Sequence, residues 1–252
     1  MNEQQRIRRF IIRRTVISFG VFFLFVIGGI YFWNFIYGLN PYMNGGAGVR
    51  KPVRNALDRN ESIFRKIFSH NHLSKTFPKS KAVKKVRVNG WLGLRNDEDT
   101  LNWKLQLVRA PGDTLVLHIE DIKALPKTEL VFDFKCIEGW DQITWWGGVQ
   151  FSELMKKYGL DAQSGMEYVG LITPDHGYYV GIDMLSMLHP QTLLVYEMNG
   201  EPLPISQGYP LRLIIPVKYG IKHLKRIGTI YFSNTRPPDY WAERGYDYYS
   251  GL

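Results

Sequence analysis

The longest apolar stretch in the chain lies close to its beginning. No charged residue occurs from Thr15 to Val49, and residues 16–36 are apolar apart from Ser18 and Asn34. At about 1.5 Å of rise per residue, a helix over this stretch crosses the ~30 Å hydrocarbon core of a membrane. No small-residue cleavage site follows it, which favours a retained anchor over a cleaved signal peptide. A buried core helix is the alternative interpretation.

After residue 86 the pattern changes to short runs of alternating apolar and polar residues, which predict strands. We expect these strands at residues 104–108, 114–119, 129–134, 193–198, 211–217 and 229–232. Two helices are expected, at residues 149–158 after a turn at Gly147-Gly148 and at residues 182–188. Asn199-Gly200 is a hairpin signal. The absence of βαβ repetition and of a phosphate-loop sequence predicts an α+β domain, mostly β, over residues 86–252.

The net charge of +9 belongs to the first third of the chain. Residues 1–14 carry +4 and residues 50–87 carry +10, whereas residues 88–252 carry −5. Because the largest block is acidic, we expect no nucleic-acid partner for the domain. The single cysteine excludes an intramolecular disulfide and a metal cluster built from several cysteines.

These patterns divide the chain into four expected segments. They are a cytoplasmic basic tail at 1–14, a transmembrane anchor at 15–38, a basic linker at 39–85 and the domain at 86–252. The positive-inside rule places the domain on the periplasmic, or extracytoplasmic, side of the inner membrane, with membrane lipid around a single-pass anchor. The arginine pairs at 8–9 and 13–14 resemble twin-arginine export signals. Residues 62–69 predict a short amphipathic helix, either packed on the domain or bound to lipid headgroups.

Two segments of the domain carry candidate chemistry. Cys136 follows an apolar strand and precedes a glycine turn, and a strand end holds a side chain rigidly toward a cavity. The alternative is a small buried hydrophobe. Arg212 stands within an apolar strand, where an unpaired charge costs several kcal/mol, so it requires an anionic partner. The loop that follows carries Lys218, Lys222 and Lys225, which are suited to a phosphate unless they form a solvated face.

Three motifs occur in order in this part of the chain. They are Cys-Ile-Glu-Gly-Trp at 136–140, HPQTLLVYEMNGEPLP at 189–204 and GYPLRLIIPVKYGIKHLK at 208–225. Together they resemble the molybdopterin-binding domain of the sulfite oxidase family over about two thirds of the chain. The branch that they resemble most is the periplasmic protein-methionine-sulfoxide reductases.

The resemblance implies a cofactor, molybdopterin with molybdenum, and a set of residues that bind it. Cys136 corresponds to the cysteine whose thiolate ligates the metal, and a soft anionic sulfur suits such a centre. The residues that correspond to pterin contacts are Thr173, Gln207, Arg212, His223, Leu224 and Lys225. The reductase branch has Asn in place of Gln207. The upstream Asn contact of the family would fall on Asn89.

The resemblance also bears on the substrate. Glu138 corresponds to an active-site carboxylate of the reductase branch, whereas sulfite-oxidising members surround the metal with arginines. A carboxylate repels sulfite, so Glu138 and Asp141 favour a neutral or cationic substrate such as a small-molecule or protein sulfoxide. His176 is a further catalytic candidate, as part of the substrate mouth or a proton donor; the alternative is a surface-loop histidine.

We therefore expect a membrane-anchored molybdopterin-dependent oxidoreductase that carries out two-electron oxygen-atom transfer, with reduction of a sulfoxide-like substrate as the leading hypothesis. Sulfite oxidation by the same fold is one alternative, and a non-catalytic anchored binding module is another. The sequence has no room for a haem domain after Lys225. A separate electron donor or acceptor, such as a membrane haem protein or a quinol-linked protein, is therefore the expected partner.

Overall fold

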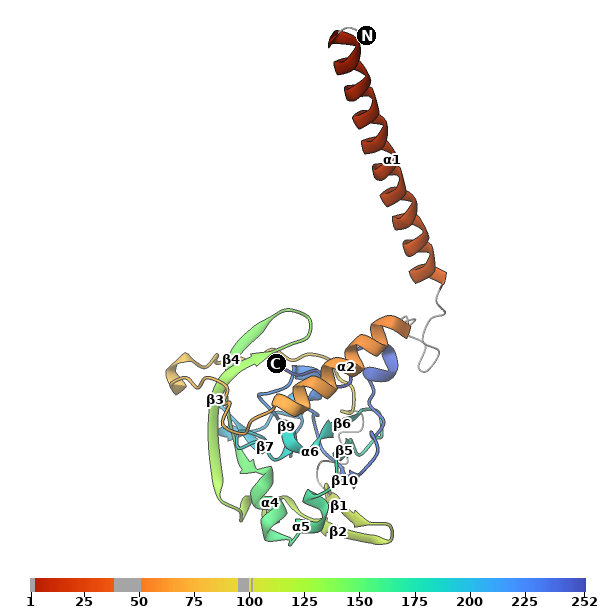
Figure 1. Ribbon diagram of the computed structural model, residues 1–252. Coiled ribbons are helices and arrows are strands. Elements are labelled where there is room, and N and C mark those ends of the chain that lie inside the picture. Colours follow the sequence, from red (N-terminus) through yellow and green to blue (C-terminus); the bar gives the residue numbers. More distant parts are fainter. Residues whose placement is uncertain (1–2, 39–50, 95–99, 101) are drawn as a thin grey trace.

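A computed structural model describes residues 3–38, 51–94, 100 and 102–252 (Figure 1). Its first helix, α1 (Glu3–Gly38), extends away from the rest of the chain. Residues 3–35 of this helix are long and apolar enough to cross a membrane, and its most apolar window has no buried residue. The expected helix over the apolar stretch is thus confirmed, although it begins earlier and includes the arginines of the tail.

The basic linker contains more structure than we predicted. Helix α2 (Lys51–Ile67) forms 17 residues of it, so the helix expected at 62–69 begins eleven residues earlier and ends at Ile67. The part of the linker from 39 to 50 lies outside the described residues. Further along, Phe77 N donates to Val131 O and Val83 N donates to Ile143 O, which lays residues 77–83 along the domain. This segment is therefore part of the folded unit.

Two five-stranded sheets form the domain. The first has the order β2-β1-β10-β5-β6, in which only β1 and β10 pair in parallel. Its strands are β1 (Leu105–Ala110), β2 (Asp113–Leu117), β5 (Tyr168–Ile172), β6 (Tyr179–Asp183) and β10 (Thr229–Ser233). The second is antiparallel and has the order β3-β4-β7-β8, with β9 paired to β7. Its strands are β3 (Lys127–Lys135), β4 (Asp141–Gln150), β7 (Leu193–Met198), β8 (Glu201–Pro202) and β9 (Arg212–Ile214).

Short helices fill the connections between strands. They are α3 (Ile119–Lys123), α4 (Phe151–Lys157), α5 (Asp161–Ser164) and α6 (Met184–Met187), with 3-10 turns at Lys79–Lys81, Ile205–Gln207, Gly220–Lys222 and Ala242–Arg244. The main core joins both sheets through fully buried side chains such as Leu107, Leu171, Leu194 and Leu213. A smaller core on β3, β4, β7 and β9 includes Phe132 and Trp146. The predicted α+β class, mostly β, is therefore confirmed.

Several predicted boundaries were wrong because one element ends where the next begins. The helix expected at 149–158 starts at Phe151, since Val149 and Gln150 still pair with β7. The helix expected at 182–188 starts at Met184, because Ile182 and Asp183 belong to β6 and still pair with β5. The strand expected at 211–217 is limited to β9. The hairpin at Asn199-Gly200 is confirmed, with φ of 56° and 83°, values that suit the turn joining β7 to β8.

The predicted turn at Gly147-Gly148 was also wrong. Both glycines lie inside β4, where the register against β7 shifts between them. A Cβ at Gly148 would stand 2.2 Å from the carbonyl oxygen of Leu194, so the close approach of β7 requires glycine there. At Gly147 the nearest atoms belong to the flexible side chains of Glu197 and Lys127, at 3.0 Å or more.

This contrast predicts different costs for two neighbouring substitutions. Gly148→Ala should lower the free energy of unfolding by about 3 kcal/mol, because the new methyl group meets backbone that cannot move without breaking the sheet. Gly147→Ala should cost less than about 1 kcal/mol. Urea titration of both variants measures the difference. Equal costs would show that β4 and β7 do not approach this closely.

Candidate active site

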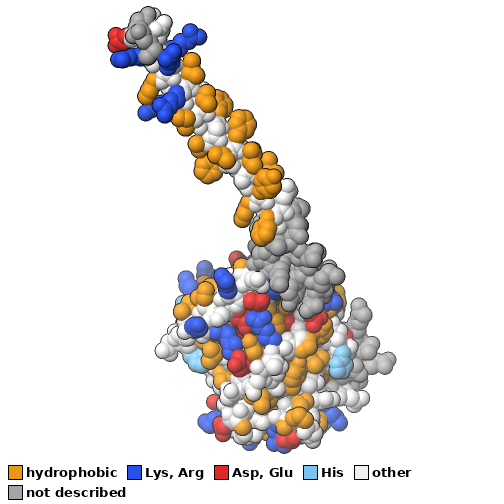
Figure 2. All heavy atoms as spheres, turned by 45° about the vertical axis from the view of Figure 1, so that its right-hand side comes forward, with side chains coloured by type: hydrophobic (Ala, Val, Ile, Leu, Met, Phe, Trp, Pro, Cys, Tyr) orange, Lys and Arg blue, Asp and Glu red, His pale blue; other side chains and the backbone are white. Residues whose placement is uncertain are grey.

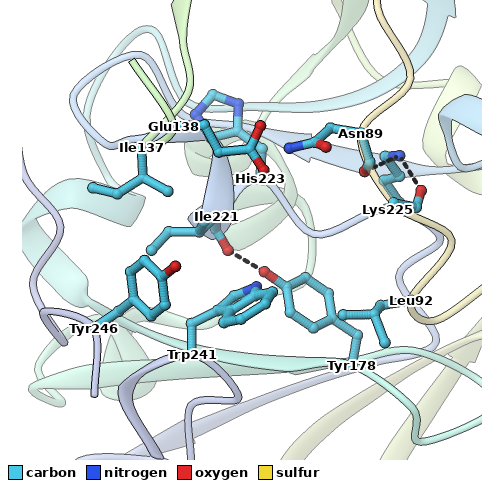
Figure 3. Close-up of a pocket in the computed structure, with 11 residues that line it drawn as sticks. Asn89, Leu92, Ile137, Glu138, Tyr178, Ile221, His223, Lys225, Trp241 and Tyr246 are labelled. Carbon is cyan, nitrogen blue, oxygen red and sulfur yellow. Dashed lines mark hydrogen bonds between the residues drawn. The ribbon is translucent and has the colours of Figure 1, made fainter. Parts of the chain in front are cut away.

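Two adjacent cavities open near the end of β3. The larger has a volume of about 350 Å³ and the smaller about 50 Å³, and both are lined by Asn89, Ile221 and Lys225. Figure 3 shows the larger one, with Glu138 and His223 on one side and aromatic rings on the other. The smaller one contains Cys136 and Arg212. The two segments that the sequence singled out therefore meet at one place.

Cys136 stands directly after β3, in the tight turn that leads to β4. Its backbone nitrogen donates to Trp140 O at 2.9 Å, and its carbonyl oxygen accepts from Gly139 N at 3.0 Å. The side chain is 4% exposed, and its Sγ accepts from Asn89 Nδ2 at 3.5 Å. Burial raises the pKa of the thiol. The protonated thiol is therefore favoured without a metal. A soft metal ion bound at the cavity would favour the thiolate instead, because it stabilises the anionic sulfur.

Asn89 reaches the thiol because its own segment is bonded to β4, where Val83 N donates to Ile143 O. Nearby, Arg87 N donates to Gln142 Oε1 at 2.8 Å. Lys225 Nζ donates to the carbonyl oxygens of Asn89 and Gly90 at 2.9 and 3.0 Å. The lysine therefore ties this segment to the loop after β9, and Asn89, which the resemblance indicates as a pterin contact, lies beside the cysteine.

Arg212 is a buried cation with a donor left over. Its Nη1 donates to the carbonyl oxygen and to Oε1 of Gln207, at 3.1 and 2.7 Å, and its guanidinium lies 4.6 Å from the ring centre of Trp146. No carboxylate pairs with it among the described residues, and its Nε has no partner. Burial lowers the pKa of this group to about 9. An anion in the adjoining cavity would supply the missing partner.

Two more basic residues stand on the same side of the cavities. Burial, followed by the charge of Arg212, lowers the pKa of Lys225 to about 7 and that of His223 to about 3. His223 is therefore neutral at pH 7. Its Nε2 lies 3.1 Å from the carbonyl oxygen of Lys218, an acceptor, so the proton belongs on Nε2. The buried Nδ1 has no partner and is left as an acceptor.

The other two lysines of the loop do not reach the cavities, contrary to our expectation of a phosphate contact. Lys218 pairs with Asp183 at 2.8 Å and Lys222 pairs with Asp239, and all four side chains are buried. These ion pairs fasten the loop to β6 and to the C-terminal segment. Both lysines therefore have carboxylate partners inside the protein.

Three further predicted residues stand outside the cavity walls. Thr173 is buried, and its hydroxyl donates to Asp175 Oδ1 at 2.6 Å and accepts from Tyr178 N at 3.1 Å. His176 is exposed at the tip of the same turn, with a φ of 53°. Leu224 is fully buried in the main core, and its carbonyl oxygen accepts from Leu213 N. None of them lines either cavity in this structure.

Glu138 lies at the rim of the larger cavity. Its Oε2 accepts from Trp140 Nε1 at 3.0 Å, and this bond, with a smaller contribution from Asn89, lowers the pKa of the exposed carboxyl. Opposite it stand Tyr178, Trp241 and Tyr246, with the hydroxyl of Tyr178 bound to Ile221 O (Figure 3). The rim is therefore anionic on one side and aromatic on the other.

Sequence reasoning missed this aromatic wall. Trp241 and Tyr246 had no place in the site predicted from the sequence, although both line the larger cavity. Their only signal was the concentration of aromatic residues near the C-terminus. Because that segment reaches the cavity through long-range contacts with α2 and β6, no local pattern could place it.

The titration of Lys225 predicts a pH dependence of stability for protein made without a cofactor. Folding lowers the pKa from 10.5 to about 7, so the unfolded chain holds one more proton between these values. Stability from this group therefore rises with pH across that window, by up to ~1.4 kcal/mol per pH unit. Lys225→Met should flatten the curve of unfolding free energy against pH, measured by urea titration in detergent. The exposed Lys85→Met is the control, and matching curves for the two variants would contradict the prediction.

The residues present fit a metal that brings its own organic ligand. Among the described residues no group of three or more His, Cys, Asp or Glu side chains could hold a metal. The cavity offers one thiol, and beside it a buried guanidinium with an unpartnered Nε. A metal here would therefore take one sulfur from the protein and its other ligands from an anionic cofactor, whose charge would meet Arg212.

Comparison with known proteins agrees with this chemistry. The family described as "Oxidoreductase molybdopterin binding domain" matches residues 92–241. A putative protein-methionine-sulfoxide reductase subunit of Azospira oryzae is 32% identical over 73% of this chain and 70% of its own length. The protein-methionine-sulfoxide reductase catalytic subunit of Campylobacter jejuni is 29% identical over 64% of this chain and 60% of its own.

Among solved structures, the sulfane dehydrogenase SoxCD of Paracoccus pantotrophus matches 66% of this chain and 46% of its own, with 17% identity and a TM-score of 0.48. The family match covers more than half of the chain, and its span includes Cys136, Arg212 and Lys225. The chain therefore belongs to the oxidoreductase molybdopterin-binding domain family and is a molybdopterin-dependent oxidoreductase.

Proposed function

We propose that this protein is a membrane-anchored molybdenum enzyme that reduces a sulfoxide-like substrate by two-electron oxygen-atom transfer. The observation that carries the proposal is that a solitary thiol and a buried, incompletely paired guanidinium line one small cavity. The thiol is the donor that a molybdenum ion needs from the protein. The guanidinium is the donor that the phosphate of a pterin needs.

Six residues that line the cavities have roles in this proposal. Cys136 ligates the metal, and Asn89 orients its sulfur through the bond from Nδ2. Arg212 and Lys225 bind the phosphate, while Gln207 holds the guanidinium in place through Oε1. His223 offers a neutral ring nitrogen to a donor on the cofactor. When bound, the metal and its pterin supply the two-electron chemistry, and the protein positions them and shapes access.

Thr173, Leu224 and His176 have smaller places in the proposal. Thr173 and Leu224 support the walls from behind, since Thr173 bonds to Tyr178 and Leu224 fills the core beneath the loop. His176 stays a candidate on the turn beside Tyr178, reached only by a substrate larger than the cavity. Lys218 and Lys222 are left out of the binding site, because their ion pairs hold the loop in shape.

The side chains at the rim of the larger cavity favour a sulfoxide over sulfite as the substrate. The carboxylate of Glu138 repels a dianion, whereas a neutral sulfoxide is unaffected and a cationic one is attracted. The rings of Trp241 and Tyr246 offer an apolar surface for the carbon groups on either side of sulfur. The names of the relatives, which are reductases of methionine sulfoxide residues in proteins, support the same substrate class.

The proposal includes the location and the partner. Helix α1 anchors the chain in the inner membrane by a single pass, with residues 1–14 in the cytoplasm, 15–38 in the membrane, 39–85 as linker and 86–252 outside. Electrons come from a separate chain, such as a membrane haem protein or a quinol-linked protein. The relatives' names, a "subunit" and a "catalytic subunit", support a division of labour of this kind.

Two measurements on full-length protein from a host that makes the cofactor test the proposal. Elemental and pterin analysis should give about one molybdenum and one pterin per chain, which follows from a single thiol ligand. Assays with an artificial electron donor or acceptor should give turnover with sulfoxides and little with sulfite. Metal without turnover on either substrate would favour the non-catalytic binding module, and turnover of sulfite alone would favour sulfite oxidation.

Glu138→Gln should change the substrate preference without changing the fold. Removing the rim charge should lower kcat/KM for a cationic sulfoxide, raise it for an anionic one and leave a neutral one within about twofold, since the charge acts through partly screened electrostatics. Steady-state kinetics with three sulfoxides that differ only in charge measure the shift. The control is Glu153→Gln on α4, a carboxylate outside both cavities. Identical preferences in the Glu138→Gln variant and the parent would exclude this carboxylate from the substrate site.

A further inference from the structure

Helix α2 turns its polar side toward the domain. Arg54 donates to the carbonyl oxygens of Tyr246 and Ala242 at 3.0 and 3.1 Å. Asp58 and Glu61 pair with Arg236 at 2.8 and 2.5 Å, and Arg65 pairs with Glu167 at 3.2 Å. These helix residues are spaced by four, three and four, so they share one face. An amphipathic helix normally packs the opposite way, with apolar residues against the core.

The apolar side of α2 is consequently left outside. Ile63 is 56% exposed and Ile67 is 68% exposed, and both lie on the face opposite Glu61. The exposed cations Arg59 and Lys66 flank them on the helix surface. Figure 2 shows hydrophobic, basic and acidic side chains side by side at the end of the domain nearest to α1.

The apolar surface continues past the end of the helix, where Leu73 is 55% exposed. Within the helix, Phe64 stacks on Tyr249 of the C-terminal segment, with ring centres 6.3 Å apart. A groove of about 380 Å³ lies here, and Ile67, Leu73 and Leu252 line it. Exposed apolar side chains that form a continuous surface with a basic border mark a site of association.

We propose that this face of α2 lies on the anionic surface of the membrane that holds α1, as a second contact besides the anchor. The proposal rests on the proposed anchoring by α1. Only twelve residues separate Gly38 from Lys51, and even when fully extended they span about 40 Å, so the face stays near the bilayer. An apolar helix face bordered by cations lies in the headgroup region of anionic membranes.

This contact has a consequence for the active site. Arg54 binds the backbone at Ala242 and Tyr246, and this segment forms the aromatic wall of the larger cavity. A helix seated on the membrane therefore fixes the distance and orientation of the cavity relative to the bilayer. An electron donor embedded in the same membrane would meet the domain in one orientation.

Fluorescent probes in full-length protein test the contact. Ile67→Cys and Val116→Cys each receive an environment-sensitive dye, and the protein is reconstituted into vesicles of anionic and zwitterionic lipids with nitroxide-labelled chains. Val116 is an equally apolar control, 48% exposed on β2, which lies at the far end of the domain from α2 in Figure 1. Wild-type protein gives the background from the buried Cys136. We expect at least about threefold stronger quenching at residue 67 than at residue 116.

The outcomes separate this proposal from the anchoring on which it rests. Protein that is extracted from vesicles by alkali would refute the anchor itself. Protein that resists extraction but shows equal quenching at the two sites would refute only the contact by α2. Shielding of residue 67 in native membranes but not in pure lipid would assign the face to a protein partner and also overturn the proposal. Arg59→Glu combined with Lys66→Glu should reduce the quenching, since it removes the attraction to anionic lipid.

Discussion

Cys136→Ser should abolish oxidoreductase activity and leave the fold intact. Serine has nearly the shape of cysteine, so the turn from Cys136 to Trp140 and the bond from Asn89 can be kept. The serine oxygen is a harder ligand than sulfur, and the hydroxyl is a far weaker acid than a thiol. Serine therefore does not replace a thiolate on a soft metal. We expect kcat to fall by at least about 1000-fold, which corresponds to ~4 kcal/mol of activation free energy.

The measurement combines kcat with an artificial electron donor, the molybdenum content and the thermal unfolding midpoint of the same preparations. A lower midpoint would indicate that the loss of activity is structural, and Cys136→Ala then repeats the test without a new polar group. The pterin content should fall less than the activity, because Arg212 and Lys225 are unchanged. A serine variant with metal and turnover like those of the parent would remove Cys136 from the centre.

The fold was predictable from the sequence wherever the signal is local. The apolar run at 193–198 located β7 to the residue, and Asn199-Gly200 located its hairpin, because apolar runs and left-handed turns leave their mark within a few residues. Strands β4, β5 and β6 were not predicted, and near the end of β4 the local signal was misleading. Gly147 and Gly148 normally indicate a turn, but the approach of β7 uses them inside a strand, and β7 lies more than forty residues away.

The sequence predicted several residues of the candidate site, but it did not predict which other residues they contact. Cys136 and Arg212 were selected because a strand end and a buried charge have physical meaning in the sequence alone, and they line one cavity. From the sequence alone, Lys218 and Lys225 were equally good candidates for a phosphate ligand. Only the fold decides between them, because Asp183 on β6 pairs with the first and no carboxylate among the described residues pairs with the second.

Arg212→Met should separate cofactor binding from folding. Methionine keeps an apolar stem against Trp146 and removes the charge, so the phosphate of the cofactor loses its buried partner. Loss of one member of a buried charge pair costs about 2–5 kcal/mol, so the affinity for the pterin should fall at least about thirtyfold. Pterin and molybdenum content after purification from a host that makes the cofactor measure the effect. Arg212→Lys should recover only part of it, because a lysine lacks the planar fork.

The same substitution should not weaken protein made in a host without the pterin. Burial lowers the pKa of Arg212 because it disfavours the charged guanidinium, so at pH 7 folding carries the cost of burying a charge with an unmet donor. Removing the charge offsets the lost bonds to Gln207. We expect an unfolding free energy equal to or above that of the parent at pH 7, measured by urea titration. A loss of more than about 3 kcal/mol would instead make Arg212 a structural residue, because its bonds to Gln207 and its contact with Trp146 would then outweigh the cost of burying its charge.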